Sequence, residues 1–152
     1  MKTISVSEAF SNAPPRSAAV LCVRGRRGGT DLVLTEWFSW LNIRRNPMIS
    51  FSLPRTSETG KNLQEGDALV LAFPPLEEAK RYREAVNVNS EGRGQDAPET
   101  VPEDGLNVRT PGGSEVLLCC TLAGSYNYPS KKVRIFNCNL EEARGNFRDF
   151  LD

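Results

Sequence analysis

Short runs of β-branched, aromatic and aliphatic residues recur along the chain, and turn-forming residues such as glycine, proline and asparagine separate them. Runs of this kind are typical of β-strands. In one of them the apolar residues Ile49, Phe51 and Leu53 alternate with Met48 and two serines, which is the period of two expected of a strand. Strands are predicted over 18–23, 30–37, 48–53, 67–73, 115–122 and 132–138.

Only two segments favour a helix. Residues 56–65 end before Gly66, and residues 76–86 carry an apolar stripe at helical spacing. A doubly wound α/β sheet needs a helix after nearly every strand, and this spacing does not supply one. The chain is therefore predicted to be all-β with short helices, folded as a closed or nearly closed barrel.

The remaining segments are irregular in composition. The length favours one domain over residues 1–152. A double proline makes residues 1–16 an N-terminal arm rather than a core strand. Residues 87–113 are rich in Gly, Pro, Asn, Asp and Glu, which predicts a long surface loop with a brief extended piece at 106–109. For the tail, 140–151, a strand extension and a short helix both remain open.

The sequence contains no histidine. This excludes imidazole-based acid–base catalysis, catalytic triads that need imidazole, and the usual zinc or non-haem iron sites. The four cysteines lie in apolar runs without a CxxC pair, and the adjacent Cys119 and Cys120 would point to opposite faces of a strand. We therefore expect buried thiols, no metal site and a reducing, cytoplasmic location.

The charges balance, with 19 Lys plus Arg against 19 Asp plus Glu. A chain without a net basic field is not expected to bind nucleic acid. The local arginine clusters at 24–27 and 44–45 are interpreted as solvated loops. No apolar run approaches the roughly 20 residues needed to span a membrane, so no membrane partner is expected.

Residues 52–63 are the most informative polar stretch, because they run from a strand end through a proline into a helix start. Free backbone N–H groups at a helix start favour an anion, and a guanidinium suits a phosphate. The alternative is that a hydroxyl caps the helix while the cations stay in solvent. Hydroxyl and basic side chains gather there at Arg55, Thr56, Ser57, Thr59 and Lys61.

An aromatic cluster precedes this stretch at 35–40, with two tryptophans and a phenylalanine among hydroxyl-bearing residues. Core or dimer contacts account for each ring taken singly, although a flat heteroaromatic ligand would need the same surroundings. The glycine-rich loop 25–29 precedes a strand and not a helix. It is therefore interpreted as a hairpin loop and not as a phosphate cradle.

These motifs resemble the flavin-reductase-like, FMN-binding split-barrel family. One match is Thr35-x-Trp37-Phe38-Ser39, followed by Asn46-Pro47 and a strand that ends in Ser52. A second is Ser57-Glu58-Thr59-x-x-Asn62-Leu63, and a third is a late strand with Cys120 near its middle. The resemblance implies a Greek-key split barrel that forms homodimers, with FMN bound non-covalently near the subunit interface.

The resemblance also implies which residues hold the cofactor. Ser57, Thr59 and Lys61 would contact the phosphate, with Arg55 nearby and Asn62 as a further cofactor-binding position of the same motif. A second group would line the ring and the ribityl chain, partly through main-chain atoms: Thr35, Glu36, Trp37 and Ser52.

Family members reduce flavin with NADH or NADPH, pass electrons to partners, or simply hold FMN. The resemblance therefore implies an FMN-dependent oxidoreductase of the flavin reductase type. The alternative is a non-catalytic FMN-binding electron carrier like flavoredoxin, and a ligand-free barrel that assembles with another protein is a third class. No residue is identified as catalytic.

Overall fold

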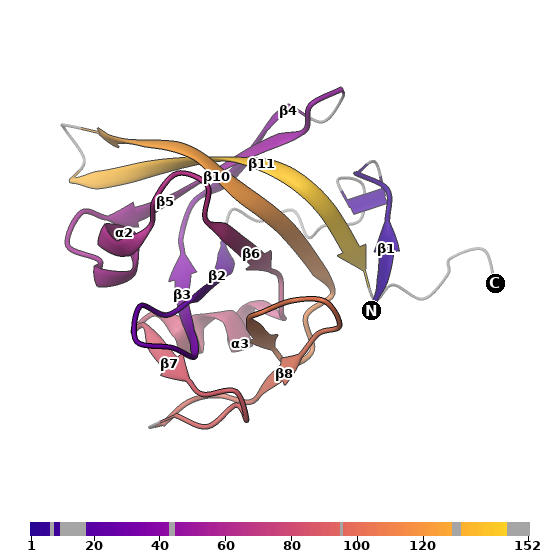
Figure 1. The fold of residues 1–152 in the computed structure, drawn as a ribbon, viewed down its shortest axis with the longest axis vertical. Coiled ribbons are helices and arrows are strands. Elements are labelled where there is room, and N and C mark those ends of the chain that lie inside the picture. The colour runs from indigo at the N-terminus through magenta and orange to yellow at the C-terminus, as the bar shows by residue number, and fades with distance from the viewer. Residues whose placement is uncertain (7, 10–17, 43–44, 95, 129–131, 146–152) are drawn as a thin grey trace.

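The computed structural model describes the chain except for residues 7, 10–17, 43–44, 95, 129–131 and 146–152. It is mostly antiparallel β-sheet with short helices, which confirms the predicted fold class (Figure 1). No helix among the described residues is long and apolar enough to cross a membrane. The elements are β1 (Lys2–Ile4), β2 (Ala19–Arg24), β3 (Thr30–Thr35), β4 (Phe38–Asn42), β5 (Met48–Pro54), α2 (Glu58–Asn62), β6 (Ala68–Ala72), α3 (Leu76–Ala79), the 3-10 turn η1 (Lys80–Tyr82), β7 (Val86–Val88), β8 (Thr100–Pro102), β9 (Arg109–Pro111), β10 (Val116–Tyr128) and β11 (Val133–Gly145).

The main sheet closes on itself. Its strand order is β4-β5-β11-β10-β6-β2-β3-β7, and every pairing is antiparallel. Only Glu36 and Trp37 separate β3 from β4, so the chain leaves its pairing with β2 and continues into pairing with β5. The strands β5 and β6 flank the β10–β11 hairpin, and α2 lies in the Greek-key connection between them.

The barrel interior is filled by aromatic and aliphatic side chains from every strand of the main sheet except β7. Phe51 of β5 stacks on Phe136 of β11 with ring centroids 5.1 Å apart, and both are fully buried. Phe38 meets Phe73 edge to face at 5.2 Å. The period of two predicted for 48–53 is confirmed, because Ile49, Phe51 and Leu53 all point into this core.

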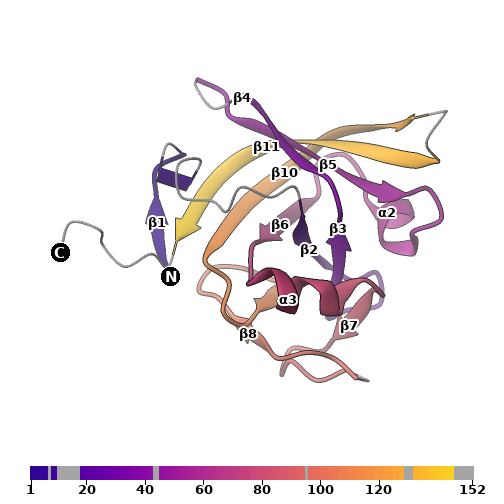
Figure 2. The ribbon, with the colours of Figure 1, turned by 180° about the vertical axis from the view of Figure 1, so that it is seen from behind.

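A second core lies on the outer face of β2, β3, β6 and β10. Strand residues such as Val20 and Leu117 meet Tyr82 of η1 and Val88 of β7 there. Figure 2 shows α3, β7 and β8 together on this side of the barrel. Residues 87–113 were expected to be a surface loop, and that expectation is wrong in part. The segment contains β8 and β9 and buries Val88 and Val108, because it covers an apolar face of the sheet.

Several element boundaries also differ from the sequence-based expectations. The helix expected over 76–86 ends at Tyr82, because Val86–Val88 pairs with β3 instead. The tail takes the strand alternative up to Gly145, and the rest of 140–151 lies outside the described residues. Within the expected arm 1–16, Lys2–Ile4 pairs with the end of β11. Residues 10–16 of that arm, including the double proline, lie outside the described residues.

The four cysteines are free and buried, as expected. Burial raises the pKa of Cys119 to about 11 and that of Cys138 to about 12, and it raises the pKa values of Cys22 and Cys120 as well. Cys119 belongs to the outer core and Cys120 to the barrel interior, so the two point to opposite faces.

This burial predicts thiols that do not react in the native protein. At pH 8 each thiol stays protonated, and the thiolate is the reactive form. A thiol reagent is expected to label no cysteine in the native protein and all four after unfolding in denaturant. As the pH rises toward 11, Cys119 should react first, because burial raises its pKa less than it raises the pKa values of Cys138 and Cys22. Rapid native labelling at pH 8, counted by mass spectrometry, would contradict the burial.

Candidate functional site

A cleft of about 640 Å³ opens where the ends of β3 and β5 meet the start of α2. Residues 83–85, which follow η1, and Val133 of β11, which pairs with Pro54 at the end of β5, complete the lining. Its volume falls in the range of roughly 300–1,000 Å³ usual for small-molecule sites. The lining residues are Val33, Leu34, Glu36, Ser52, Pro54, Thr56, Ser57, Glu58, Arg83, Glu84, Ala85 and Val133.

Thr35 fixes the β3–β5 junction behind this cleft. Its hydroxyl oxygen lies 2.8 Å from the carbonyl oxygens of both Trp37 and Ser52, and it donates its single proton to one of them at a time. The backbone N–H of Ser52 also donates to the Trp37 carbonyl at 3.3 Å. Since Thr35 is fully buried, it shapes the wall without lining it.

Replacing Thr35 with valine is expected to lower the free energy of unfolding by about 1–3 kcal/mol. The carbonyls of Trp37 and Ser52 lose the hydroxyl that donates to them at this buried position. Chemical denaturation monitored by tryptophan fluorescence measures the change. Thr56→Val is the matched control, because Thr56 is exposed and should change stability by less than about 0.5 kcal/mol. Equal stability of the two variants would show that the Thr35 hydroxyl does not hold the β3–β5 junction.

Ser57 begins α2 and faces the cleft. Its Oγ accepts a hydrogen bond from the Gly60 N–H at 3.1 Å, so the capping interpretation from the sequence is confirmed for this residue. A hydroxyl that accepts can still donate its own proton to a ligand. The helix start is also held against the barrel, since a Cβ on Gly60 would stand 3.4 Å from both Leu53 and Phe136.

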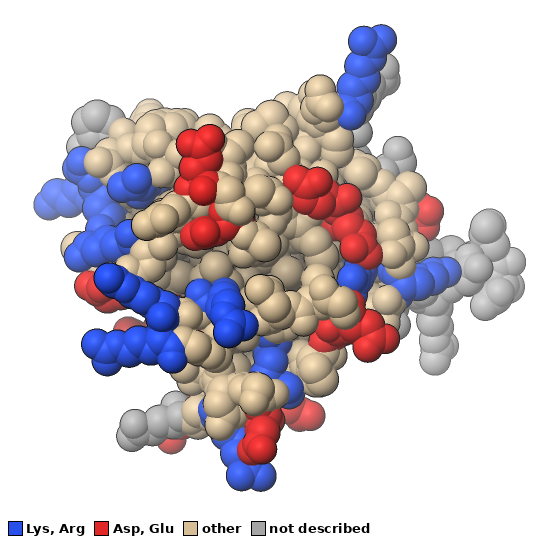
Figure 3. All heavy atoms as spheres, viewed as in Figure 1, with Lys and Arg blue, Asp and Glu red and all other residues tan. Residues whose placement is uncertain are grey.

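The charges around the cleft are mixed. Among the described residues that line it, Glu36, Glu58 and Glu84 are acidic and Arg83 is the cation. Glu58 is paired with Lys61 at 3.5 Å. Lys and Arg side chains also gather on the surface over α2 and the neighbouring β2–β3 loop (Figure 3).

The structure brings together three of the residues predicted to bind a cofactor: Glu36, Ser52 and Ser57 all line the cleft. Thr59 is buried in α2 beside it, with 5% of its surface exposed. The other predicted residues do not line the cleft. Trp37, Arg55 and Lys61 are exposed nearby, and Asn62 lines a neighbouring cleft.

Arg83 and Thr56 are cleft residues that the resemblance did not assign. Arg83 lies within the helix predicted over 76–86, where Tyr82 or Arg83 was expected to follow the apolar stripe and nothing local assigns it to a binding site. It reaches the cleft because the helix ends early and the chain turns toward β7. Thr56 lies in the polar stretch 52–63, so its position directly before Ser57 could have identified it as a cleft residue.

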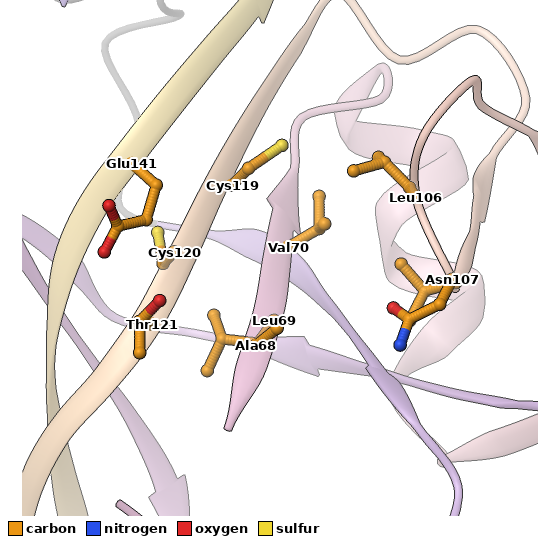
Figure 4. Close-up of a pocket in the computed structure, with 10 residues that line it drawn as sticks. Ala68, Leu69, Val70, Leu106, Asn107, Cys119, Cys120, Thr121 and Glu141 are labelled. Carbon is orange, nitrogen blue, oxygen red and sulfur yellow. The ribbon is translucent and has the colours of Figure 1, made fainter. Parts of the chain in front are cut away.

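A smaller pocket, of about 150 Å³, opens between β6, β10 and residues 106–108 (Figure 4). Its walls are mostly apolar, with Leu106, Val70 and Cys119 among them. This volume is below the range usual for a cofactor site, and none of the predicted cofactor-binding residues lines the pocket. The larger cleft is therefore the candidate site.

No protein-family model matches the sequence, and the search of curated proteins found no match either. Solved structures, however, share the architecture. BorF, the flavin reductase component of a bacterial two-component tryptophan halogenase, has a TM-score of 0.68 and 14% identity over 93% of this chain and 87% of that one. An FMN-binding protein from Thermus thermophilus has a TM-score of 0.67 and 12% identity over 89% and 74% of the two chains.

A third structure is the NADH:FAD oxidoreductase SgcE6 of Streptomyces globisporus, with a TM-score of 0.66 and 14% identity over 91% of this chain and 80% of that one. The three share an architecture with this chain while differing at most positions of the sequence. The chain therefore has the split-barrel fold of flavin reductases and FMN-binding proteins.

Proposed function

We propose that the chain is an FMN-binding flavoprotein whose cofactor lies in the 640 Å³ cleft. The observation that carries the proposal is the convergence on one cleft of Glu36, which follows β3, with Ser52 and Ser57 of the later segment that joins β5 to α2. The fold is one that flavin reductases and an FMN-binding protein use. Residues 1–152 act as one domain in this proposal.

The residues present fit the two ends of FMN. Hydroxyls of Thr56 and Ser57 and the guanidinium of Arg83 supply donors for a phosphate. Apolar side chains, such as Val33 and Pro54, supply a surface on which a flat ring can lie. We place the phosphate at Ser57 and the ring and ribityl chain along Glu36 and Ser52.

The other predicted contacts remain part of the proposal. Arg55 and Lys61 are exposed beside the helix start, from which long side chains can turn toward a phosphate. Thr59 would contribute its hydroxyl or backbone from within the first turn of α2. Thr35 and Trp37 would act on the ring end through the β3–β5 junction and its main-chain atoms.

Bound FMN would supply hydride and electron-transfer chemistry, which needs no histidine from the protein. The described residues would bind the cofactor, orient it against the cleft wall and shield one of its faces from water. We propose a flavin reductase-like oxidoreductase that uses NADH or NADPH, and SgcE6, which shares the fold, is an NADH:FAD oxidoreductase. The second candidate is an electron carrier that holds FMN without turnover.

Anaerobic absorbance spectroscopy of the purified protein with FMN separates these functions. The oxidoreductase predicts a flavin spectrum that bleaches on addition of NADH or NADPH. The carrier predicts bleaching with dithionite or a partner reductase and none with a nicotinamide. A protein that remains colourless and ignores added FMN overturns the proposal and leaves a ligand-free barrel.

The proposal includes a homodimer. Four large apolar side chains are 40–52% exposed near β4 and the end of β10: Trp37, Leu41, Tyr126 and Tyr128. Figures 1 and 2 show β4 crossing the middle of the β10–β11 hairpin, with the end of β10 extending to the opposite side from β4. Large exposed aromatic surfaces favour association. Light scattering should give twice the chain mass of 16.8 kDa, and a monomer at micromolar concentration would contradict the dimer.

A cytoplasmic location is also part of the proposal. It is supported by the four cysteines, which are free and buried.

A further inference from the structure

A second cleft, of about 470 Å³, adjoins the first on the other side of α2. It lies between the β2–β3 loop, α2 and the residue at the centre of β7. All of its lining side chains are charged or carry a carboxamide: Arg26, Arg27, Asp31, Glu58, Asn62 and Asn87. A lining of this kind suits a polar ligand and not an apolar one.

The loop that carries the two arginines is held in place. Gly25 and Gly29 are joined by a backbone hydrogen bond of 3.0 Å, and the Asn87 side chain donates to the Gly28 carbonyl at 3.1 Å. Gly29 has φ +67°, and a Cβ there would overlap the Val88 carbonyl oxygen. The backbone at Arg26 and Arg27 is therefore anchored to β7, which limits where their side chains can reach.

The acidic side chains of this cleft already have partners. Asn87 donates to Asp31 at 2.7 Å, and Lys61 pairs with Glu58 at 3.5 Å. Arg26 donates to the Asn62 carboxamide oxygen at 3.5 Å. Within the described part of the chain, neither Arg26 nor Arg27 forms an ion pair, so their charges remain available to an anion.

The two clefts adjoin each other at Glu58 of α2. Glu58 lines both of them, and Asn62, one turn later on the same side of the helix, lines the second. The proposed function places the flavin phosphate at Ser57, directly before Glu58. A ligand that extends beyond that phosphate would therefore enter the cleft formed by Arg26 and Arg27.

We propose that this second cleft binds the adenosine diphosphate part of a dinucleotide, an inference that rests on the proposed function. Guanidinium groups match its phosphates, carboxylates accept from ribose hydroxyls, and carboxamides pair with the edge of adenine. Two dinucleotides carry this group, FAD and the nicotinamide dinucleotides. The glycine-rich loop 25–29 then contributes to nucleotide binding through its arginine side chains and not through its backbone.

The test compares the wild-type chain with the double variant Arg26→Gln/Arg27→Gln. Flavin fluorescence quenching gives the dissociation constants of FMN and FAD. Isothermal titration of the FMN-loaded protein with ADP-ribose gives the affinity of the cleft for the adenosine diphosphate part of a nicotinamide dinucleotide. If FAD is the source, the variant should lose at least about tenfold in FAD affinity and less than twofold in FMN affinity. If a nicotinamide dinucleotide is the source, the ADP-ribose affinity should fall by the same factor.

Arg24→Gln is the matched control, because Arg24 is exposed at the end of β2 and does not line the cleft. It should leave all three affinities unchanged. Unaltered FAD and ADP-ribose binding in the double variant would overturn this inference while FMN binding remained intact. A protein that binds no flavin would overturn the proposed function, and this inference with it.

Discussion

Replacing Phe51 with alanine is expected to lower the free energy of unfolding by about 3–5 kcal/mol. Phe51 is fully buried and stacks on Phe136 at 5.1 Å, at the point where β5 pairs with β11. Removing the ring loses the free energy gained by burying it and leaves a cavity. The pairing of the surrounding strands prevents them from moving together to fill that cavity. Urea denaturation followed by circular dichroism measures the loss.

Leu76→Ala is the control for this prediction. Leu76 is also a large apolar residue, but it is 43% exposed at the start of α3. Its truncation should change stability by less than about 0.5 kcal/mol. A loss below about 1 kcal/mol for Phe51→Ala would show that the stacked pair does not form the centre of the barrel.

Replacing Ser57 with aspartate is expected to weaken FMN binding by at least about 100-fold. Aspartate caps a helix as well as serine does, so α2 should remain intact. Its carboxylate would, however, stand beside the proposed phosphate position, where two like charges about 4 Å apart repel by roughly 4 kcal/mol near a protein surface. Fluorescence quenching of the flavin measures the change in dissociation constant.

Riboflavin, which lacks the phosphate, is the control ligand for the Ser57→Asp variant. Its affinity should change by less than about threefold, and the free energy of unfolding should stay within about 0.5 kcal/mol of the wild-type value. Equal losses for FMN and riboflavin would mean that the phosphate does not lie at Ser57. Unchanged FMN binding would remove Ser57 from the site.

Local sequence pattern predicted the strands well, because a strand with one buried face repeats its apolar residues at a period of two. The segment with Ile49, Phe51 and Leu53 shows this directly. The strand β4 was missed as a separate element, because 30–37 was predicted as one strand and 38–42 was not assigned. The chain changes partner at Glu36 and Trp37, and pairing with β5 is a long-range event that no local pattern reports.

Long-range strand pairing also explains why the helix after β6 is shorter than predicted. The apolar stripe from Leu76 is real, and Ala79 and Tyr82 are buried as a helix would bury them. Val86 belongs to the same stripe but pairs with β3, and the strand pairing prevails over helical propensity.

Some residues of the candidate site could likewise be predicted from local sequence, and others could not. Ser57 and Ser52 could be predicted, because they stand in one continuous polar stretch between a strand and a helix. The role of Glu36 came from the resemblance. Arg83 and the cleft of Arg26 and Arg27 depend on contacts between segments far apart in sequence, which local pattern does not report.

Amide chemical shifts of the ¹⁵N-labelled protein, recorded with and without FMN, test most directly whether the larger cleft is the flavin site. FMN is expected to shift the amides of Glu36, Ser52, Ser57 and Arg83, which line the cleft. The amide of Leu106, at the smaller pocket, should not move. Shifts confined to the smaller pocket, or no shifts at millimolar FMN, would contradict the proposed function.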